Sequence, residues 1–409
     1  MNSQKTIHIV GAGFSGLSLA CLLSEQKNFR IVIFEKSENV GGLIQSKKTS
    51  HGLVETGANS IIETEVVKKF LKQMNISTIS PKLTAKARYF YRKKMTRWPL
   101  NLLETLHFLL KLLFHVSTLK FFLKTSTHQT LENWATKKFT TAFGKYILSP
   151  AFQGIYSLPG QYLNADLILN ETLSGKKNTS KGIVTCSAGM QDIINKMADY
   201  LKSQDVHFQL NTRFSFDSQT ADYTVICTSA ADAASLVKNH DPEVYKLLKV
   251  ISMNNLLTVT CFVEKQDRLR GFGCLIPENS GIDCLGVLFN SDSFDERVST
   301  NNQVSETYIF GGIKADITNK LSQNDLMSSI QKIRKELFSS QQKIISIHKT
   351  HWENGLPIYN NNMFEFQNAY KKYQNKEIYL HGNYTAGIGL SKILSQSIKL
   401  AQKIKKDIQ

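Results

Sequence analysis

The stretch Thr6 to Glu35, TIHIVGAGFSGLSLACLLSEQKNFRIVIFE, decides the fold of this 409-residue chain. Its short apolar strand, Ile7 to Val10, runs directly into the turn Gly11-Ala12-Gly13-Phe14-Ser15-Gly16. A helix is expected over Leu17 to Leu23, and a second apolar strand, Ile31 to Phe34, ends on Glu35. A glycine-rich turn between a strand and a helix, followed by a second strand, predicts a βαβ unit.

Each glycine of the turn has a separate role in such a unit. Gly11 permits the tight turn, Gly13 lets the backbone approach a pyrophosphate at the helix N-terminus, and Gly16 lets the helix pack against the strand. The glycines alone would also fit a turn in another α/β unit. Because Glu35 follows about twenty residues later, where it can accept hydrogen bonds from a ribose, the stretch predicts a dinucleotide site.

The residues beyond Glu35 indicate which dinucleotide is bound. Glu35 to Gly42 resembles the ExxxxxGG continuation of flavoproteins in the amine-oxidase-like group, and His51 to Ala58 resembles the next strand and Glu-x-Gly turn of that group. The resemblance implies FAD. Since Gly382 to Leu390 contains neither Cys nor His, FAD is expected to bind non-covalently.

Further segments resemble, in the same chain order, the oxygen-dependent protoporphyrinogen oxidase family and its coproporphyrinogen-oxidising relatives. The Gly154-Ile155-Tyr156 block is not typical of generic amine oxidases, and Gly271 to Glu278 and Leu285 to Ser291 favour the protoporphyrinogen branch. The other matching segments are Leu131 to Phe139, Leu163 to Ala165, Cys186 to Ile194, Val225 to Ala230, His351 to Tyr359 and Tyr379 to Leu390.

This resemblance implies a set of binding residues. The backbone of Phe214 is expected to lie beside the adenine. Arg88 is expected to pair with a substrate propionate, and Leu275 and Phe289 are expected to contact the substrate. Arg88 could instead be one more member of a solvated basic run. The implied FAD-binding residues are Gly11, Gly13, Phe14, Ser15, Gly16, Glu35, Lys36, Gly41, Gly42, Gly57, Ala58, Asn59, Ser60, Phe214, Gly382, Asn383, Ile388, Gly389 and Leu390.

The fold class implied is α/β, or α+β overall, with three interleaved parts. A discontinuous Rossmann-like FAD-binding domain comprises residues 1–84, 181–238 and 372–409. A mixed-sheet substrate domain comprises residues 85–94 and 239–371, and a helical membrane-associated lobe comprises residues 95–176.

The implied function is the six-electron oxidation of protoporphyrinogen IX to protoporphyrin IX in haem biosynthesis, with O2 as acceptor and H2O2 as by-product. No catalytic side chain is expected, because the flavin carries the chemistry. Isolated histidines, including His107, His115, His351 and His381, are interpreted as structural, and no metal site is predicted. Two alternatives stay open: a coproporphyrinogen III oxidase, and a non-catalytic flavoprotein or tetrapyrrole carrier.

Two positions depart from the family pattern near the expected flavin. Ser391-Lys392 follows Gly389-Leu390 where the family usually has Pro-Asp, and Ala58 stands where the family has proline. We expect the change at Ser391-Lys392 to affect the local flavin environment, and Lys392 suggests the carrier alternative.

The composition limits the kinds of binding partner and the cellular location that we expect. The formal charge of +17 predicts attraction to polyanions, and an anionic membrane surface is favoured over nucleic acid because no nucleic-acid-binding motif is visible. The six cysteines are interpreted as reduced core residues. The first strand begins too early for a signal peptide, so the expected location is peripheral, on the cytoplasmic face of the cell membrane. The family resemblance leaves room for a homodimer and for product transfer to ferrochelatase.

The segment Leu102 to Leu123 is the expected membrane contact. It follows a basic run and combines a broad Leu- and Phe-rich face with a narrow polar stripe that includes Glu104, His107 and Lys111. Because titratable groups interrupt every turn, we expect a helix that lies in the membrane interface or covers an apolar cavity, and not a spanning helix. An ordinary buried helix of an all-α lobe is the remaining alternative.

Overall fold

The computed structural model describes residues 4–117, 125–126, 128–173, 182–218, 220–265, 267–339, 342–373 and 377–407. The predicted βαβ unit is present at its centre. Five parallel strands form one sheet in the order β16-β10-β1-β2-β9, and this order places β1 between β10 and β2. The strands are β1 (Lys5–Val10), β2 (Phe29–Phe34), β9 (His207–Gln209), β10 (Tyr223–Ile226) and β16 (Ile378–Leu380).

Helices cover both faces of this sheet. α1 (Phe14–Leu23) packs against α8 (Gln191–Ser203) and α15 (Leu390–Asp407), and these helices share a core with Ile7, Ile9 and Ile33 of the strands. On the other face, α9 (Ala230–Val237), α10 (Pro242–Leu248) and α14 (Asn361–Tyr370) share a second core with Ile226, Ile378 and Leu380. Next to this domain lie α2 (Glu65–Gln73) and the strand pairs β3 (Ser46–Thr49) with β4 (Gly52–Glu55) and β5 (Ile61–Ile62) with β8 (Ile183–Val184).

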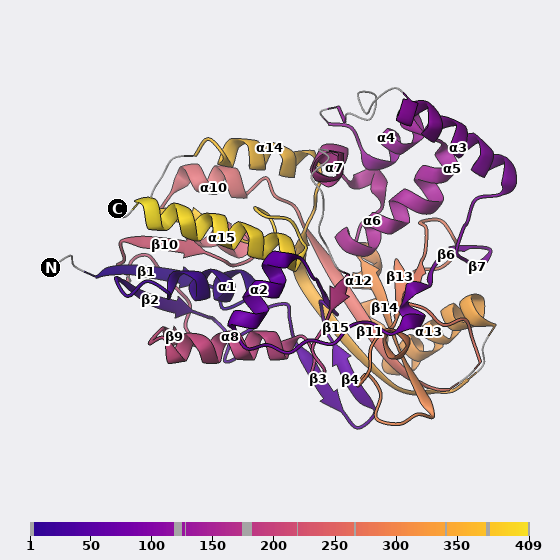
Figure 1. Ribbon diagram of the computed structural model, residues 1–409, viewed down its shortest axis with the longest axis horizontal. Coiled ribbons are helices and arrows are strands. Elements are labelled where there is room, and N and C mark those ends of the chain that lie inside the picture. Colours follow the sequence, from indigo (N-terminus) through magenta and orange to yellow (C-terminus); the bar gives the residue numbers. More distant parts are fainter. Residues whose placement is uncertain are drawn as a thin grey trace.

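A mixed seven-stranded sheet, in the order β15-β11-β14-β13-β12-β6-β7, stands beside the first sheet (Figure 1). Its covered face packs on α12 (Ile313–Asn319) and α13 (Gln323–Phe338). Buried residues of that face alternate along the strands with residues of a second face, which contacts Thr56 after β4 and Gly154 of the helical lobe. The strands are β6 (Arg88–Arg92), β7 (Lys94–Thr96), β11 (Met253–Glu264), β12 (Gly273–Leu275), β13 (Gly286–Phe289), β14 (Gln303–Gly311) and β15 (Ile344–Pro357), and the short helix α11 (Asn290–Ser293) follows β13.

A helical lobe lies at one end of the molecule (Figure 1). It contains α3 (Leu102–Ser117), α4 (Leu131–Lys138), α5 (Thr141–Phe143), a five-residue π-helical turn (Gly144–Leu148), α6 (Ser149–Tyr156) and α7 (Ala165–Leu173). Phe108 fixes the rotation of α3, because its ring stacks on Phe143 with centroids 4.5 Å apart. His115 Nε2 also lies 2.6 Å from the carbonyl oxygen of Lys138.

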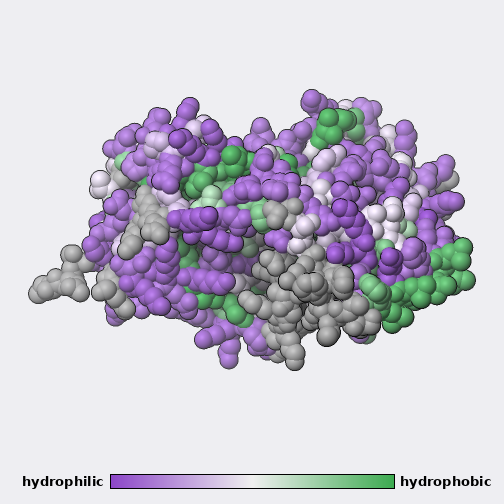
Figure 2. Space-filling view, turned by 90° about the horizontal axis from the view of Figure 1, so that it is seen from above, coloured by the Kyte–Doolittle hydropathy of each residue, from purple (hydrophilic) through white to green (hydrophobic). Residues whose placement is uncertain are grey.

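The opposite face of α3 is exposed. Leu102 and Leu103 are 84% and 77% exposed, and Figure 2 shows a large hydrophobic surface at this end of the molecule. The alternative of an ordinary buried helix is therefore wrong. The exposed apolar residues of α3 are Leu102, Leu103, Leu106, Leu109, Leu110, Leu113 and Phe114. Within the described residues, no helix is long and apolar enough to cross a membrane.

Local hydrogen bonds set the ends of several elements. α4 ends at Lys138, and Thr140 caps the next helix, α5, by accepting the Phe143 N–H. β9 ends at Gln209, because the chain turns back toward Glu35. Residues 118–123 of the expected segment Leu102 to Leu123 lie outside the described part. We keep the three domain ranges given above as a proposal.

Candidate functional site

The glycine turn has the geometry that a close backbone approach requires. Gly11 has φ of +108°, and a side chain on Gly16 would place its Cβ 2.0 Å from the Gly11 carbonyl oxygen. No other residue fits at Gly16, so α1 begins in direct contact with the end of β1. Gly11 and Gly16 thus have the turn and packing geometry predicted for them at the carboxyl edge of the parallel sheet, and the approach of a pyrophosphate to Gly13 stays a prediction.

Glu35 directly follows β2 beside this turn, and its side chain is buried. One oxygen accepts the Ala12 N–H at 2.8 Å, and the other accepts both the N–H and the hydroxyl of Ser37, at 3.0 and 2.6 Å. A carboxylate has about four acceptor sites. These three bonds hold the side chain rigidly and leave acceptor capacity for a ribose hydroxyl.

A second glycine segment closes on the first. Gly41 donates its N–H to the Ala12 carbonyl at 2.8 Å, and a Cβ on Gly42 would lie 3.4 Å from the Gly13 Cα. Gly41 and Gly42 have φ of +128° and +58°, which favours glycine at both. The predicted ExxxxxGG segment therefore lies against the predicted phosphate turn.

The Glu-x-Gly segment continues this wall. Gly57 leaves no room for a side chain, because its Cβ would lie 2.3 Å from the Leu43 carbonyl oxygen. Asn59 donates to the Gly57 carbonyl at 3.4 Å, and Ala58 packs on the first core. Gly57, Ala58, Asn59 and Ser60 are all half-buried.

The C-terminal segment approaches the same edge from β16. Its Gly382 donates to the Thr385 hydroxyl at 3.0 Å, and the Asn383 carbonyl accepts a hydrogen bond from the Tyr359 hydroxyl. The backbone at Gly389 is open, since a Cβ there would meet no atom within 4 Å. Ile388 and Leu390 pack on the second and the first core respectively.

Lys392, one of the two departures from the family pattern, lies over Gly387. A Cβ on Gly387 would approach the Lys392 side chain at 2.9 Å. The aliphatic part of the Lys392 side chain therefore packs against the glycine segment at the start of α15.

The remaining predicted nucleotide contacts lie on the Glu35 side. Phe214 is buried, its ring packs edge-on against Phe34 at 5.0 Å, and Thr212 near it donates its N–H to the Glu35 carbonyl at 2.9 Å. Lys36 forms an exposed ion pair with Asp232 at 3.0 Å. Both residues lie near Glu35, the Lys36 side chain is engaged by α9, and their contacts with FAD stay a prediction.

These segments together fit FAD. Cβ-free backbone at Gly11, Gly13, Gly41 and Gly42 forms a cradle at the N-terminus of α1, and Glu35 retains an acceptor site next to it. Non-covalent FAD binding is a prediction consistent with this arrangement.

The register of the seven-stranded sheet identifies the residues of its open face. Directly paired residues share a face. Arg88 pairs with Gly273, which pairs with Leu288, and Phe90 pairs with Leu275 on the same side. On this face, called the open face, Arg88, Phe90, Leu256, Leu275, Leu288, Ile309 and Trp352 are exposed or half-buried, whereas Thr258, Thr260 and Thr307 are buried.

Two hydrogen bonds show where the open face points. Thr258 Oγ1 and Trp352 Nε1 both donate to the carbonyl oxygen of Thr56, at 3.1 and 2.9 Å. Thr56 directly precedes the predicted flavin-binding Gly57. The open face therefore adjoins the wall of the nucleotide site, and Arg88 lies exposed at its far side with its guanidinium 5.2 Å from the Phe272 ring centroid.

Phe289 requires a correction. It belongs to the covered face, is fully buried, and contacts Arg268 and the Phe338 ring of α13. Since a side chain with no accessible surface cannot touch a substrate, we no longer assign Phe289 to substrate contact. Leu275 lies half-buried on the open face, under Gly154 of α6.

Sequence reasoning missed Leu288, Phe90 and Ile309, which are half-buried on the open face. The alternation of side chains along a strand could have indicated these residues, because placing Leu275 on the open face also fixes the side on which its paired neighbours lie. The sequence motifs alone do not show which strands pair.

Glu35 and His381, two titratable residues next to the glycine segments, are both held by hydrogen bonds. His381 is fully buried, and burial lowers the pKa of its imidazole to about 4. Its Nε2 lies 2.8 Å from the Ser397 hydroxyl, which lies 2.9 Å from the Ser18 hydroxyl. This network joins β16 to α15 and α1, in agreement with a structural role. All six cysteines are buried thiols, and no metal-binding cluster occurs among the described residues.

Comparison with known proteins extends over most of the chain. The chain is 21% identical to protoporphyrinogen oxidase 2, chloroplastic/mitochondrial, of Arabidopsis thaliana, over 98% of this chain and 94% of that protein. A crystal structure of an Exiguobacterium sp. 255-15 protein superposes with a TM-score of 0.79 at 14% identity, covering 99% of each chain.

The fold is shared with proteins of different function. A putrescine oxidase variant superposes with a TM-score of 0.74 at 12% identity over 99% of each chain, so the fold alone does not fix the substrate. The sequence model of the flavin containing amine oxidoreductases matches residues 14–390. With the glycine cradle, Glu35 and the C-terminal glycine segment all at one sheet edge, the chain belongs to the family of flavin-containing amine oxidoreductases.

Proposed function

We propose that this protein binds FAD non-covalently and oxidises protoporphyrinogen IX to protoporphyrin IX, with O2 as electron acceptor. One observation carries the proposal: the open face of the seven-stranded sheet combines half-buried apolar side chains with Arg88 and adjoins the segment before Gly57. The similarity to a plant protoporphyrinogen oxidase over nearly the whole chain supports the same substrate.

The chemistry of the substrate matches this face. A tetrapyrrole macrocycle is broad and mostly apolar, so a sheet face bearing Phe90, Leu275 and Leu288 can contact it without losing hydrogen bonds. Its propionates need a cation, and the guanidinium of Arg88 offers a fixed pair of donors.

The residues of the chain would bind and orient the substrate, and the flavin, when bound, would accept the hydride. Arg88 would fix the rotation of the macrocycle through one propionate, and the apolar residues of the open face would exclude water from it. The fixed hydrogen bonds from Thr258 and Trp352 to the Thr56 carbonyl hold this face and the nucleotide site in register. No side chain of the described site is required to transfer a proton in this proposal.

We also propose that α3 attaches the protein peripherally to an anionic membrane surface, on the cytoplasmic face. Its exposed apolar side chains would enter the acyl boundary, and the nearby exposed Lys93, Lys94 and Arg97 would meet anionic headgroups. A homodimer and product transfer to ferrochelatase remain compatible with this arrangement and rest on the family resemblance alone.

The experiment compares protoporphyrinogen IX and coproporphyrinogen III side by side on FAD-loaded protein, with porphyrin fluorescence and H2O2 release as readouts. We expect both signals with protoporphyrinogen IX. Faster oxidation of coproporphyrinogen III would favour the coproporphyrinogen alternative. Tight binding of either compound without peroxide release would favour the carrier.

A further inference from the structure

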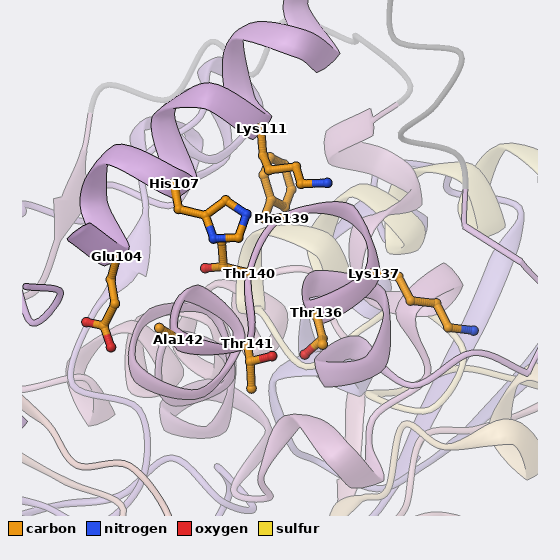
Figure 3. Close-up of a pocket in the computed structure, with 9 residues that line it drawn as sticks. All are labelled: Glu104, His107, Lys111, Thr136, Lys137, Phe139, Thr140, Thr141 and Ala142. Carbon is orange, nitrogen blue, oxygen red and sulfur yellow. The ribbon is translucent and has the colours of Figure 1, made fainter.

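Two arginines of β6, Arg88 and Arg92, differ in what contacts their guanidinium groups. Arg92 is engaged by the helical lobe: its Nη1 and Nη2 contact the two Glu104 carboxylate oxygens at 2.5 and 3.0 Å, and Nη1 also donates to the Pro99 carbonyl at 3.0 Å. Figure 3 shows Glu104 in the first turn of α3, on the wall of a cavity of about 410 Å³ that α3 forms with α4 and α5. Arg92 therefore links β6 to the lobe.

Arg88 has different surroundings. Its side chain is exposed, and within the described part of the chain no carboxylate or hydrogen-bond acceptor pairs with its guanidinium. It contacts the Phe272 ring instead, whose centroid lies 5.2 Å from the guanidinium carbon. Gly273, the direct partner of Arg88 in the sheet, has no side chain that would separate the two. Because contact with a ring face uses no acceptor, the N–H donors of Arg88 stay available for a carboxylate.

The backbone of Phe272 is held on both sides. Its N–H donates to the Ala87 carbonyl at 2.8 Å, and its own carbonyl accepts the Phe289 N–H at 3.0 Å. Gly271, the residue before it, lets the chain pass close to β6, since a Cβ there would lie 2.6 Å from the same Ala87 carbonyl oxygen. The half-buried Phe272 ring therefore projects from backbone that is fixed to the start of β6 and to β13.

A ring in a fixed position restricts the long Arg88 side chain. A free, exposed arginine has many rotamers, and binding a carboxylate would require one of them to be selected. A cation–π contact at an exposed site shifts such an equilibrium by about two- to fivefold. The Phe272 ring can thus prepare the guanidinium for a ligand.

We propose that Phe272 is a positioning residue, which holds the Arg88 guanidinium at the edge of the open face so that it receives one carboxylate of a tetrapyrrole. The inference rests on the proposed function and adds the residue that prepares its carboxylate anchor. Phe272 acts through Arg88, so its effect should depend both on Arg88 and on the carboxylates of the ligand.

The test measures binding of protoporphyrin IX, the product of the proposed reaction, and of its dimethyl ester to FAD-loaded full chain, by fluorescence anisotropy in the same mild detergent. The ester keeps the macrocycle but lacks the carboxylates, so the ratio of the two dissociation constants measures carboxylate recognition. We expect wild type to bind the free acid about thirtyfold more tightly than the ester. Phe272→Leu, which removes the ring and keeps an apolar side chain, should lower this ratio about two- to fivefold.

Three further variants separate positioning from damage to the fold and from direct contact with the macrocycle. Phe272→Tyr restores a ring and should keep the wild-type ratio. Adding Phe272→Leu to Arg88→Ala should change neither dissociation constant, because the side chain that Phe272 positions is already absent. Phe90→Leu removes a ring from the open face itself, and it should weaken binding of the acid and of the ester equally.

A wild-type ratio in Phe272→Leu would overturn the positioning role. Equal weakening of acid and ester in this variant, or a further loss when it is added to Arg88→Ala, would also overturn it. If wild type binds acid and ester equally, the carboxylate anchor and the inference are both wrong.

Oxidation is followed on the same preparations, so that the two proposals can fail separately. The expected binding ratios without peroxide release from protoporphyrinogen IX would reject the proposed oxidation and support the positioning role. Binding of neither compound by wild type would reject both.

Discussion

The two large sheets of this protein are built differently. The five-stranded sheet has helices on both faces, so its side chains are buried on both sides, and the predicted nucleotide contacts lie at its carboxyl edge, in glycine backbone and the Glu35 carboxylate. The seven-stranded sheet is covered by α12 and α13 on one face only. Its open face keeps half-buried side chains next to Thr56.

This difference shows which part of the sequence determines each region. At the nucleotide edge the absence of a side chain matters, since a Cβ at Gly16 or Gly57 would collide with backbone. The open face is specified by side-chain identity, and adjacent residues of one strand therefore have separate roles. Leu288 and Phe289 form such a pair.

The largest effect is expected on the covered face. Phe289→Ala should lower the free energy of unfolding by about 3–5 kcal/mol, because the fully buried ring packs against Arg268 and Phe338. Urea unfolding followed by circular dichroism measures this change. A loss of less than about 1 kcal/mol would show that the covered face does not carry the stability of this sheet.

The second effect concerns pH and the five-stranded sheet. Burial lowers the pKa of His381 to about 4, from 6.5 for an exposed histidine. As pH falls from 6.5 to 4, the unfolded chain binds a proton that the folded protein does not, so stability is lost in this window. The loss approaches about 3 kcal/mol at pH 4.

Urea midpoints at neutral pH and near pH 4 measure this effect against His381→Gln, which cannot titrate. Other titrating groups contribute to both proteins, so the difference between them isolates His381. Equal losses in the two proteins would contradict a neutral, buried imidazole at this position.

A smaller effect is expected at the nucleotide edge. Glu35→Ala should weaken FAD binding by about 2 kcal/mol, or roughly thirtyfold, because a buried acceptor is removed and the Ala12 N–H loses its partner. Equilibrium dialysis with FAD fluorescence gives the dissociation constant. Glu38→Ala, at an exposed neighbouring position, serves as the control, and equal FAD affinity in both variants would argue against Glu35 as the ribose acceptor.

The smallest effect on stability is expected at Leu288, and it distinguishes the open face from the covered face most directly. Leu288→Ala should cost about 1 kcal/mol of stability or less, since the side chain is only half-buried, but should raise KM for protoporphyrinogen IX several-fold. Steady-state porphyrin fluorescence and urea unfolding on the same preparation give both numbers. A stability loss as large as that of Phe289→Ala, with KM unchanged, would remove Leu288 from the open face.

The sequence predicted the nucleotide edge well, because each feature there is local in the chain. Gly11, Gly16 and Glu35 lie within one βαβ unit, whose geometry follows from spacing alone. The open face was predicted less well, since it depends on pairing between distant strands such as β6 and β12. One residue of register separates Leu288 from Phe289, and no local motif distinguishes them. The helix α3 was predicted as amphipathic, but only tertiary packing at Phe108 shows which face is exposed.

The measurement that tests the account most directly is the anaerobic rate of flavin reduction by protoporphyrinogen IX in wild type, Arg88→Ala and Arg88→Lys, followed by loss of the yellow absorbance. If Arg88 anchors a propionate on the open face, Arg88→Ala should lose about 2–5 kcal/mol in kcat/KM with FAD content unchanged, and Arg88→Lys should recover only part of it. In Arg97→Ala, which removes an exposed cation of the same basic run, the flavin should be reduced at the wild-type rate. Wild-type reduction in Arg88→Ala would contradict the account and return Arg88 to the solvated surface.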